Sequence, residues 1–282
     1  MAWTLKYPVL KEIMKKLGFI IVLCMLISIG AVANGQAMPE EETVFKYQKI
    51  DNKAFKVGEK LEYKFAYGLI NAGTATLEVK KHPKKINNRE ILHIDGKGQS
   101  NKAFDLFFKV RDSYETYIDE EGIFPWLFVR RIHEGGYEKA QDYKFFQHQG
   151  KVKNEDEEVY SVPHGIQDML SSFYFARTLD FSNIKKGDEF EFESFVDEEI
   201  YPLRIRYSGK KTIKIKKGKF DCLVFHPVIQ EGRIFKSDED LTVYITNDEN
   251  KIPILAKAKI LVGSLRMELT DYQNLANPIA KR

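Results

Sequence analysis

The residues best suited to chemistry lie together in the segment VPHGIQDMLSSFYFAR, which spans residues 162–177 and contains a histidine, an aspartate, two serines and an arginine. Serine, histidine and aspartate are the side chains of a nucleophilic hydrolase, in which the histidine activates the serine hydroxyl. Such a serine usually occupies a sharp turn between glycines, in the pattern G-x-S-x-G. This pattern does not occur in the sequence, so the segment lacks the signal of a serine nucleophile.

The same segment has the spacing of an amphipathic helix. Its apolar residues form one stripe at 3.6 residues per turn, namely Ile166, Met169, Leu170, Phe173 and Ala176. Asp168 falls in the first turn and Arg177 in the last turns, where the helix dipole favours an anion and a cation. Ser171 and Ser172 fit as small residues that let a helix approach a sheet. We predict one main helix over about residues 164–179, with structural roles for Asp168, Phe173 and Arg177.

The histidines show no metal-binding pattern. Neither H-x-H nor H-E-x-x-H spacing occurs among the six, which are His82, His93, His133, His148, His164 and His226. The sequence therefore predicts no metal and no cofactor. A hydrolase that uses His133 or His164 with Asp112 stays open as an alternative, because the fold can bring distant residues together.

Two charged residues lie on otherwise apolar strand faces. If residues 110–118 and 126–132 are strands, the first carries Asp112 and the second Arg130 on a face with period-two apolar neighbours. A lone buried charge is costly, so we expect the two to pair directly, or through one water, or to line a wet cavity. Three readings stay open: a structural ion pair, catalysis, or a ligand cleft with an apolar wall of Tyr114, Trp126 and Phe128.

Strand signals dominate the rest of the chain. Short runs rich in aromatic and β-branched residues, bounded by Gly, Asn or Asp, occur throughout residues 59–272, and EFEFESF, YPLRIRYSG and KTIKIKKG are three of them. The connections are too short for crossover helices, so neighbouring strands should pair antiparallel. We predict a mainly β protein with one large antiparallel sheet, curved into a half-open barrel or a two-sheet sandwich. It forms a single domain, residues 38–282, with its core at about 43–275.

The N-terminal sequence has the form of a signal peptide, residues 1–37. Lysines precede an apolar run from Leu17 to Val32, and small residues follow it. We predict cleavage after Ala37, a periplasmic or secreted location and no integral membrane span in the mature chain. A membrane anchor is the alternative, disfavoured because the run is short for a bilayer span of about 20 residues. Cys24 lies inside the run, which disfavours a lipoprotein, and leaves Cys222 as the only cysteine of the mature chain.

The charge balance argues against nucleic acid as a partner. The chain has 44 basic and 41 acidic residues; four and one of them precede residue 38, which leaves 40 of each. Proteins that bind nucleic acid concentrate positive charge. The basic cluster at residues 210–219 alternates with isoleucines and fits the solvated face of a strand hairpin.

Four sequence blocks resemble a known family. They are VGEKLEYKFAYGLINAGTATLEV, FKVRDSYETYIDEEGIFPWLFVRRIHEGGYEKAQDYKF, VPHGIQDMLSSFYFARTLDF and DLTVYITNDENKIPILAKAKILVGSLRMEL. Their order, and the pattern Q-D-x-L-S-x-x-Y-x-x-R at Gln167 to Arg177, resemble the exported bacterial family of domain of unknown function 3108 (DUF3108), known from Bacteroidetes and Proteobacteria. The resemblance covers about residues 55–272. It implies a β-rich exported protein and supplies no catalytic residues.

These observations favour binding over catalysis. We predict an envelope protein that holds an amphiphilic ligand, such as a lipid, a lipid-linked glycan or an outer-membrane client, on an apolar concave face. Its candidate ligand-binding residues are Asp112, Arg130, Tyr114, Trp126 and Phe128. The alternatives are a cell-envelope hydrolase and a structural envelope subunit, for which a partner would be another envelope protein.

Overall fold

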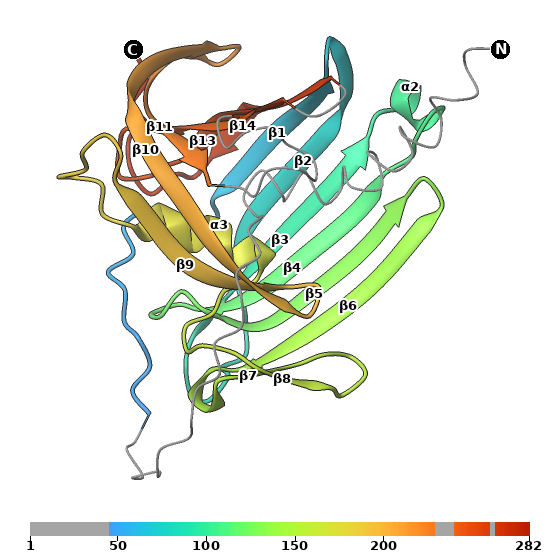
Figure 1. The fold of residues 1–282 in the computed structure, drawn as a ribbon, viewed down its shortest axis with the longest axis vertical. Coiled ribbons are helices and arrows are strands. Elements are labelled where there is room, and N and C mark those ends of the chain that lie inside the picture. Colours follow the sequence, from blue (N-terminus) through green and yellow to red (C-terminus); the bar gives the residue numbers. More distant parts are fainter. Residues whose placement is uncertain (1–44, 229–239, 260–262) are drawn as a thin grey trace.

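The computed structural model describes residues 45–228, 240–259 and 263–282. The predicted signal peptide and its cleavage site lie outside the described residues. Within them the chain forms one open antiparallel sheet of 14 strands that curves around a helix (Figure 1). The predicted fold class, a mainly β protein with a large antiparallel sheet, is confirmed. It is one continuous sheet and not two separate ones.

The strands follow one another along the chain, with short helices between some of them. The first eight are β1 (Lys60–Tyr67), β2 (Ile70–Lys81), β3 (Ile91–Ser100), β4 (Arg111–Asp119), β5 (Pro125–Glu134), β6 (Tyr137–Phe146), β7 (Lys151–Lys153) and β8 (Val159–Ser161). The other six are β9 (Glu189–Val196), β10 (Glu199–Ile215), β11 (Gly218–Pro227), β12 (Leu241–Thr246), β13 (Pro253–Lys259) and β14 (Ser264–Gln273). The helices are α2 (Lys102–Asp105), the 3-10 turn η1 (Gln147–Gln149) and α3 (Met169–Thr178).

The two halves of the chain join where β1 pairs with both β2 and β14. From there the sheet runs through β2 to β8 on one side and through β14 to β9 on the other, and it ends at these two strands without closing. Two-residue turns with positive φ link several neighbours, as at Gly135–Gly136 and at Asp197–Glu198. Such turns match the right-handed twist of the strands they join.

The concave side of the sheet carries the main core. Along β4 every second residue from Asp112 to Ile118 is buried, which is the alternation that a half-buried strand requires. Strand faces and the inner face of α3 meet in one cluster that includes Leu61, Ile94, Phe128, Tyr143 and Phe173. The core therefore fills the space between the helix and the sheet.

Strand β10 corrects one sequence prediction. YPLRIRYSG and KTIKIKKG were expected to be separate strands divided at Gly209, but they form a single strand of 17 residues. The pairing with β11 shifts register between Tyr207 and Gly209, where one extra residue is accommodated as a bulge. Gly209 has φ +135°, a conformation that its missing side chain permits. Gly209, which suggested a turn in the sequence, thus lies at a bulge within a continuous strand.

Helix α3 begins five residues later than the predicted start at 164. Residues 164–165 form a turn, with φ +79° at Gly165, and Gln167 forms a parallel bridge with Ser194 of β9, so the stretch before Asp168 is not helical. Asp168 is the N-cap: its carboxylate accepts from the backbone N–H groups of Leu170 and Ser171, each at 2.7 Å. The Ser171 hydroxyl accepts from the Asp168 N–H at 2.8 Å, which completes a capping box.

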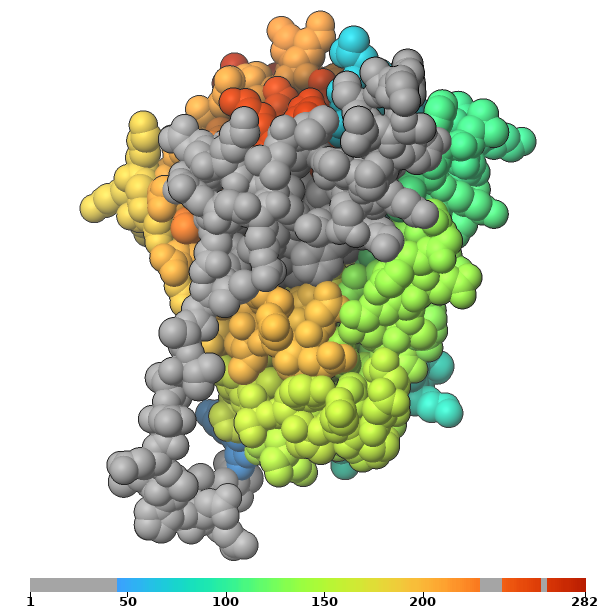
Figure 2. All heavy atoms as spheres, turned by 45° about the vertical axis from the view of Figure 1, so that its right-hand side comes forward, coloured from blue at the N-terminus to red at the C-terminus, as the bar shows by residue number. Residues whose placement is uncertain are grey.

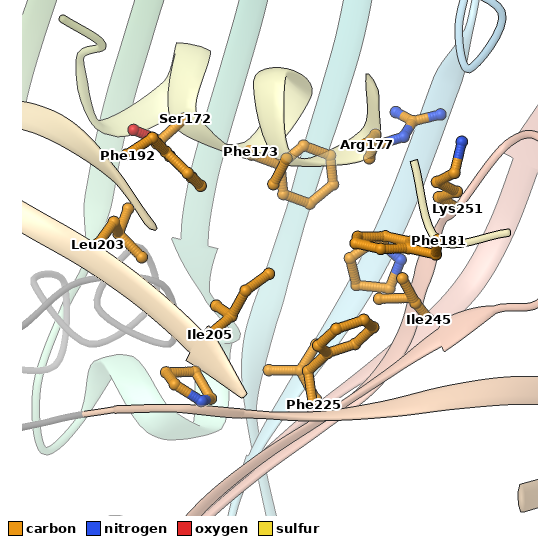
Figure 3. Close-up of a pocket in the computed structure, with 14 residues that line it drawn as sticks. Ser172, Phe173, Arg177, Phe181, Phe192, Leu203, Ile205, Phe225, Ile245 and Lys251 are labelled. Atoms are coloured by element: carbon orange, nitrogen blue, oxygen red, sulfur yellow. The ribbon is translucent and has the colours of Figure 1, made fainter. Parts of the chain in front are cut away.

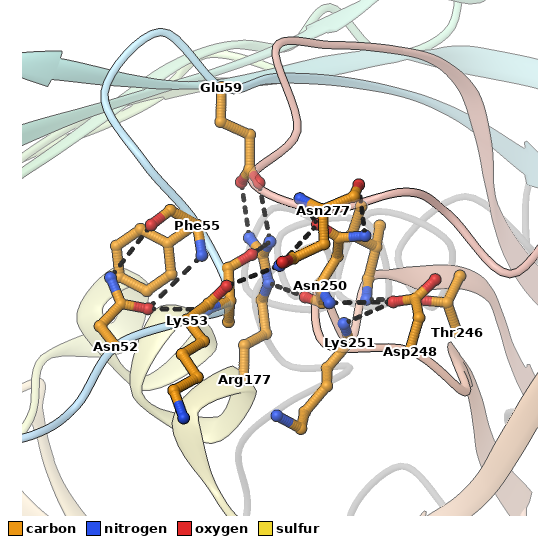
Figure 4. A network of polar contacts seen from close by, with 12 residues as sticks. Asn52, Lys53, Phe55, Glu59, Arg177, Thr246, Asp248, Asn250, Lys251 and Asn277 are labelled. Atoms are coloured by element: carbon orange, nitrogen blue, oxygen red, sulfur yellow. Dashed lines mark hydrogen bonds and ion pairs between the residues drawn. The ribbon is translucent and has the colours of Figure 1, made fainter.

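The other end of α3 is fixed by a buried polar network (Figure 4). The Arg177 guanidinium donates to both carboxylate oxygens of Glu59, at 2.6 and 2.8 Å, and to the carbonyl oxygens of Ala54 and Asn250, at 3.0 and 2.9 Å. The Asn250 side chain in turn donates to the Asn277 carbonyl at 3.0 Å. These contacts join the helix to the segment before β1, to the β12–β13 turn and to the C-terminal segment.

Candidate functional site: two pockets beside helix α3

Two apolar pockets flank α3 on the concave side of the sheet, and Phe173 lines both. The β1–β4 pocket lies between α3 and strands β1 to β4, with Met267 of β14 at its wall. The β9–β13 pocket lies on the other side of the helix, against strands β9 to β13 (Figure 3). Each has a cavity volume of about 70 Å³ and opens to solvent.

Small residues in register create the β1–β4 pocket. One cross-strand row on the concave face runs from Tyr63 through Ala75 and Gly98 to Asp112. Ala75 and Gly98 carry little or no side chain, so the sheet is hollow between Tyr63 and Asp112. A Cβ placed on Gly98 would have one neighbour within 4 Å, the Asp112 Cβ at 3.9 Å. The space above Gly98 is therefore open.

Gly96 lies in the next row and has a different role. A Cβ there would come within 3.2 Å of Leu77, 3.3 Å of the Tyr114 carbonyl oxygen and 3.5 Å of Leu170. The missing side chain lets the first turn of α3 approach the sheet closely. The two glycines of the sequence HIDGKG thus seat the helix and open the pocket.

A buried polar cluster forms one end of the β1–β4 pocket. Asp112 and Tyr114 line the pocket, and Glu134 and Arg130 lie behind them; all four are at most 5% exposed. Three of their polar atoms have no hydrogen-bonding partner among the described residues: the Tyr114 hydroxyl, the Arg130 Nε and the Glu134 Oε1. Unpaired buried polar atoms are rare in native proteins and mark places where water or a ligand can bind.

The two carboxyl groups of this cluster hold a proton. Burial raises the pKa of Glu134 to about 9, and the neighbouring charge of Asp112 adds to the shift. Burial also raises the pKa of Asp112. A side-chain hydrogen bond with Glu134, the His133 backbone N–H at 3.0 Å and the Arg130 charge each lower this pKa, but by less than burial raises it. At neutral pH the two carboxyl groups therefore share a proton in the hydrogen bond between them.

Arg130 does not form the direct pair with Asp112 that the sequence suggested. Its guanidinium donates to Gln141 Oε1 and to Asp197 Oδ1, both at 2.9 Å. In the sheet it lies opposite Tyr114, one row away from Asp112. Asp197 belongs to the β9–β10 turn, which reaches across the open side of the barrel and also contacts Lys139 of β6 at 2.8 Å. Arg130 and Asp112 nevertheless share the buried face, because the Arg130 charge lowers the pKa of Asp112.

Of the three aromatic residues expected beside this pair, Tyr114 lines the β1–β4 pocket, and Trp126 and Phe128 line neither pocket. Phe128 is buried in the main core and stacks on Tyr143 with ring centroids 6.0 Å apart. Trp126 packs in a separate cluster with Ile91 and Phe124. The β4–β5 register shifts at this point, so that Trp126 has no residue directly opposite, and its Nε1 donates to Asp119 at 3.3 Å.

The residues of the hydrolase alternative have other partners. The His133 ring is exposed and lies 3.9 Å from Glu138, and His164 Nδ1 contacts the Gln147 carbonyl oxygen at 2.6 Å. The Ser171 hydroxyl accepts a hydrogen bond from the Asp168 N–H in the helix cap. Cys222 is buried, and burial raises the pKa of its thiol to about 12. Among the described residues there is no group of three or more His, Cys, Asp or Glu side chains placed to hold a metal ion.

Sequence reasoning missed the residues that shape the site. Glu134 is not among the residues predicted for the site, although it lies two residues beyond Ile132 on the same alternating face. The alternation of Gly96 and Gly98 along β3 was a second signal, since two glycines on one strand face leave that face without side chains.

Fold and site together define a half-open, barrel-like β protein with a helix across its apolar interior. Its structure is similar to that of a beta-barrel-like protein of domain of unknown function DUF1849 from Brucella abortus, with a TM-score of 0.52, 12% identity and coverage of 78% of this chain and 99% of that chain. The chain belongs to the DUF3108 family, described as a protein of unknown function, whose model matches residues 62–270. The family predicted from the sequence blocks is therefore confirmed.

Two further solved structures are more distantly similar. They are a DUF1089 family protein from Pseudomonas aeruginosa, with a TM-score of 0.36 and 10% identity over 65% of this chain and 88% of that chain, and a hypothetical protein from Chlamydia trachomatis, with a TM-score of 0.35 and 8% identity over 80% and 92%. A comparison with curated protein sequences found no significant match. In the part of the chain that the structure describes, the helices are too short or too polar to cross a membrane.

Proposed function

We propose that this protein is exported to the bacterial cell envelope and binds an amphiphilic ligand inside its half-open barrel without transforming it. The apolar part of the ligand lies between α3 and strands β1 to β4. Its polar group lies at the Asp112 and Tyr114 end of the same pocket. The N-terminal signal-peptide pattern supports the envelope location.

One observation carries the proposal: a mainly apolar pocket ends at buried polar atoms that lack partners. Ligand sites combine these features, since apolar walls supply affinity and a few placed polar groups fix orientation. Two of these atoms belong to residues that line the pocket: the Tyr63 and Tyr114 hydroxyls, each of which can donate and accept. They suit a polar group that both donates and accepts hydrogen bonds, such as a hydroxyl.

The test is native mass spectrometry, with lipid extraction, of protein purified from its own envelope. We expect a bound amphiphile in the wild-type protein and its loss in a Gly98→Leu variant, because the leucine side chain would fill the hollow between Tyr63 and Asp112. Thr74→Leu is the matched control. Thr74 is exposed on the outer face of β2, beside Ala75, so a leucine side chain there should leave the ligand bound.

The alternatives give different results. A folded Gly98→Leu variant that retains as much amphiphile as the wild type would contradict the pocket assignment. Protein from the envelope that carries no amphiphile at all would favour a structural subunit. Cleaved ligand in the extract, dependent on His133 or His164, would favour the hydrolase.

A further inference from the structure

An exposed apolar patch lies where the β1–β2 turn and the segment after α2 meet, at one end of the barrel. We call it the rim patch; it consists of Leu69, Ile70, Leu106 and Phe107, with exposed fractions of 104%, 61%, 84% and 71%. Single exposed apolar residues are common, but a cluster of large ones indicates an interaction surface.

The two segments of the patch are joined to each other. The Asn101 side chain, which caps α2, donates to the Asn71 carbonyl oxygen at 2.5 Å, and its backbone N–H donates to the Ala72 carbonyl oxygen at 3.0 Å. Both segments lie at the same end of the molecule in Figure 1, and both project at its surface in Figure 2, the β1–β2 turn at the top and the α2 segment beside it.

The fold holds Leu106 and Phe107 outward. Phe104 and Phe108, on either side of them, are buried, and the Phe108 ring covers Gly135, where an added Cβ would lie 2.2 Å from it. The backbone N–H groups of Phe107 and Phe108 both donate to the Phe104 carbonyl oxygen at 2.9 Å. With its ends anchored in the core, this segment presents the two side chains between them to solvent.

The charge around the patch favours an anionic partner. Lys102 and Lys109 are exposed on either side of Leu106 and Phe107. The nearby acid, Asp105, is paired with Arg111 at 2.7 Å, so the lysines are not neutralised by it. Apolar side chains flanked by lysines are typical of segments that insert into the surface of a membrane containing anionic lipid.

The patch lies at the end of the strands that line the β1–β4 pocket. Gly98 lies three residues before Asn101, and Phe65 lies four residues before Leu69, so at about 3.3 Å per residue the pocket begins roughly 10–13 Å from the rim. We propose that the rim patch docks the protein on an anionic lipid membrane. This rests on the proposed function, because docking would bring the pocket to the amphiphiles of that membrane.

The experiment is co-sedimentation of the folded protein, expressed without the predicted signal peptide, with vesicles of phosphatidylcholine with and without phosphatidylglycerol. We expect stronger binding when phosphatidylglycerol is present, and weaker binding as salt rises. The double variant Leu106→Ser/Phe107→Ser should bind at least about tenfold less, because two apolar side chains no longer enter the bilayer. Each of Lys102→Gln and Lys109→Gln should reduce binding to anionic vesicles by about fivefold.

The matched control is Val57→Ser/Val159→Ser, which removes apolar residues that are 43% and 58% exposed elsewhere on the surface. It should bind vesicles as the wild type does. Equal binding by the rim variant and the wild type, or absence of wild-type binding, would overturn the proposal. So would a dimer in sedimentation equilibrium that only the rim variant dissociates, since the patch would then bind a second copy.

The two proposals fail separately. The Leu106→Ser/Phe107→Ser variant should keep its capacity for a fluorescent fatty-acid probe added in solution, and Gly98→Leu should keep its vesicle binding. Probe binding without vesicle binding in the wild type would refute the docking surface alone. Vesicle binding without probe binding would refute the pocket alone.

Discussion

The buried ion pair between Glu59 and Arg177 provides the sharpest test of how α3 is held. The Glu59 side chain is fully buried and that of Arg177 is 2% exposed. Glu59→Gln keeps the size of the side chain but removes its charge. The guanidinium is then left with the carbonyl oxygens of Ala54 and Asn250 and the rings of Phe55, Phe173 and Tyr174 around it.

The expected cost follows from the stranded charge. Removing one partner of a buried pair costs about 3–5 kcal/mol, because the other stays in a medium that solvates it poorly. Arg177→Met should lower the free energy of unfolding by the same amount. It should cost about 1 kcal/mol more for each hydrogen bond to a carbonyl oxygen that is lost. The double variant leaves no unpaired charge, so its cost should be lower than the sum of the two by at least about 2 kcal/mol.

Urea unfolding followed by tryptophan fluorescence measures these free energies, and equal m-values show that the same transition is compared. The control is Glu62→Gln in β1, three residues along the chain, whose 2.8 Å pair with Lys60 is about one-third exposed. That change should cost less than about 1 kcal/mol. Additive costs in the cycle, or a Glu59→Gln cost no larger than that of the control, would refute the view that this pair anchors the helix.

Three further predictions concern the core, the carboxyl pair and the β9–β10 turn. Phe173→Ala should destabilise by about 3–5 kcal/mol, because the ring separates the two pockets, whereas Ser172→Ala should be close to neutral in the same unfolding assay, because the buried hydroxyl has no partner among the described residues. The folded protein keeps the Glu134 proton up to a pKa of about 9, while the unfolded chain releases it near 4.5. The free energy of unfolding should therefore fall between these pH values, by at most about 1.4 kcal/mol per pH unit, and Glu134→Gln should flatten the dependence; an unchanged slope would contradict the pKa shift. Asp197→Asn keeps a residue that tolerates positive φ but removes the ion pair with buried Arg130, so it should cost about 3 kcal/mol and speed hydrogen exchange in β9 and β10; exchange as slow as in the wild type would show that the ion pair does not hold the turn.

Local patterns made the strands and their faces predictable. The buried side of β4, with Asp112, Tyr114, Thr116 and Ile118, follows from alternation alone, because successive side chains of a strand point to opposite faces. The helix was placed by its apolar stripe, but its first residue was not, because a turn at residues 164–165 and the bridge of Gln167 to β9 keep the preceding stretch out of the helix. The failure at Gly209 has the same origin, since glycine signals a turn as readily as a bulge until the partner strand is known.

The sequence by itself determined the antiparallel β class, the family and which side chains share a strand face, because each depends on residues a few positions apart or on motifs read directly. Only the tertiary structure decided what those faces meet. Arg130 pairs with Asp197, 67 residues away, and not with Asp112, because the β9–β10 turn reaches across the open barrel. The pocket exists because Ala75 and Gly98 fall into one row of the sheet under α3. Register and long-range packing fix both results, and no local pattern encodes them.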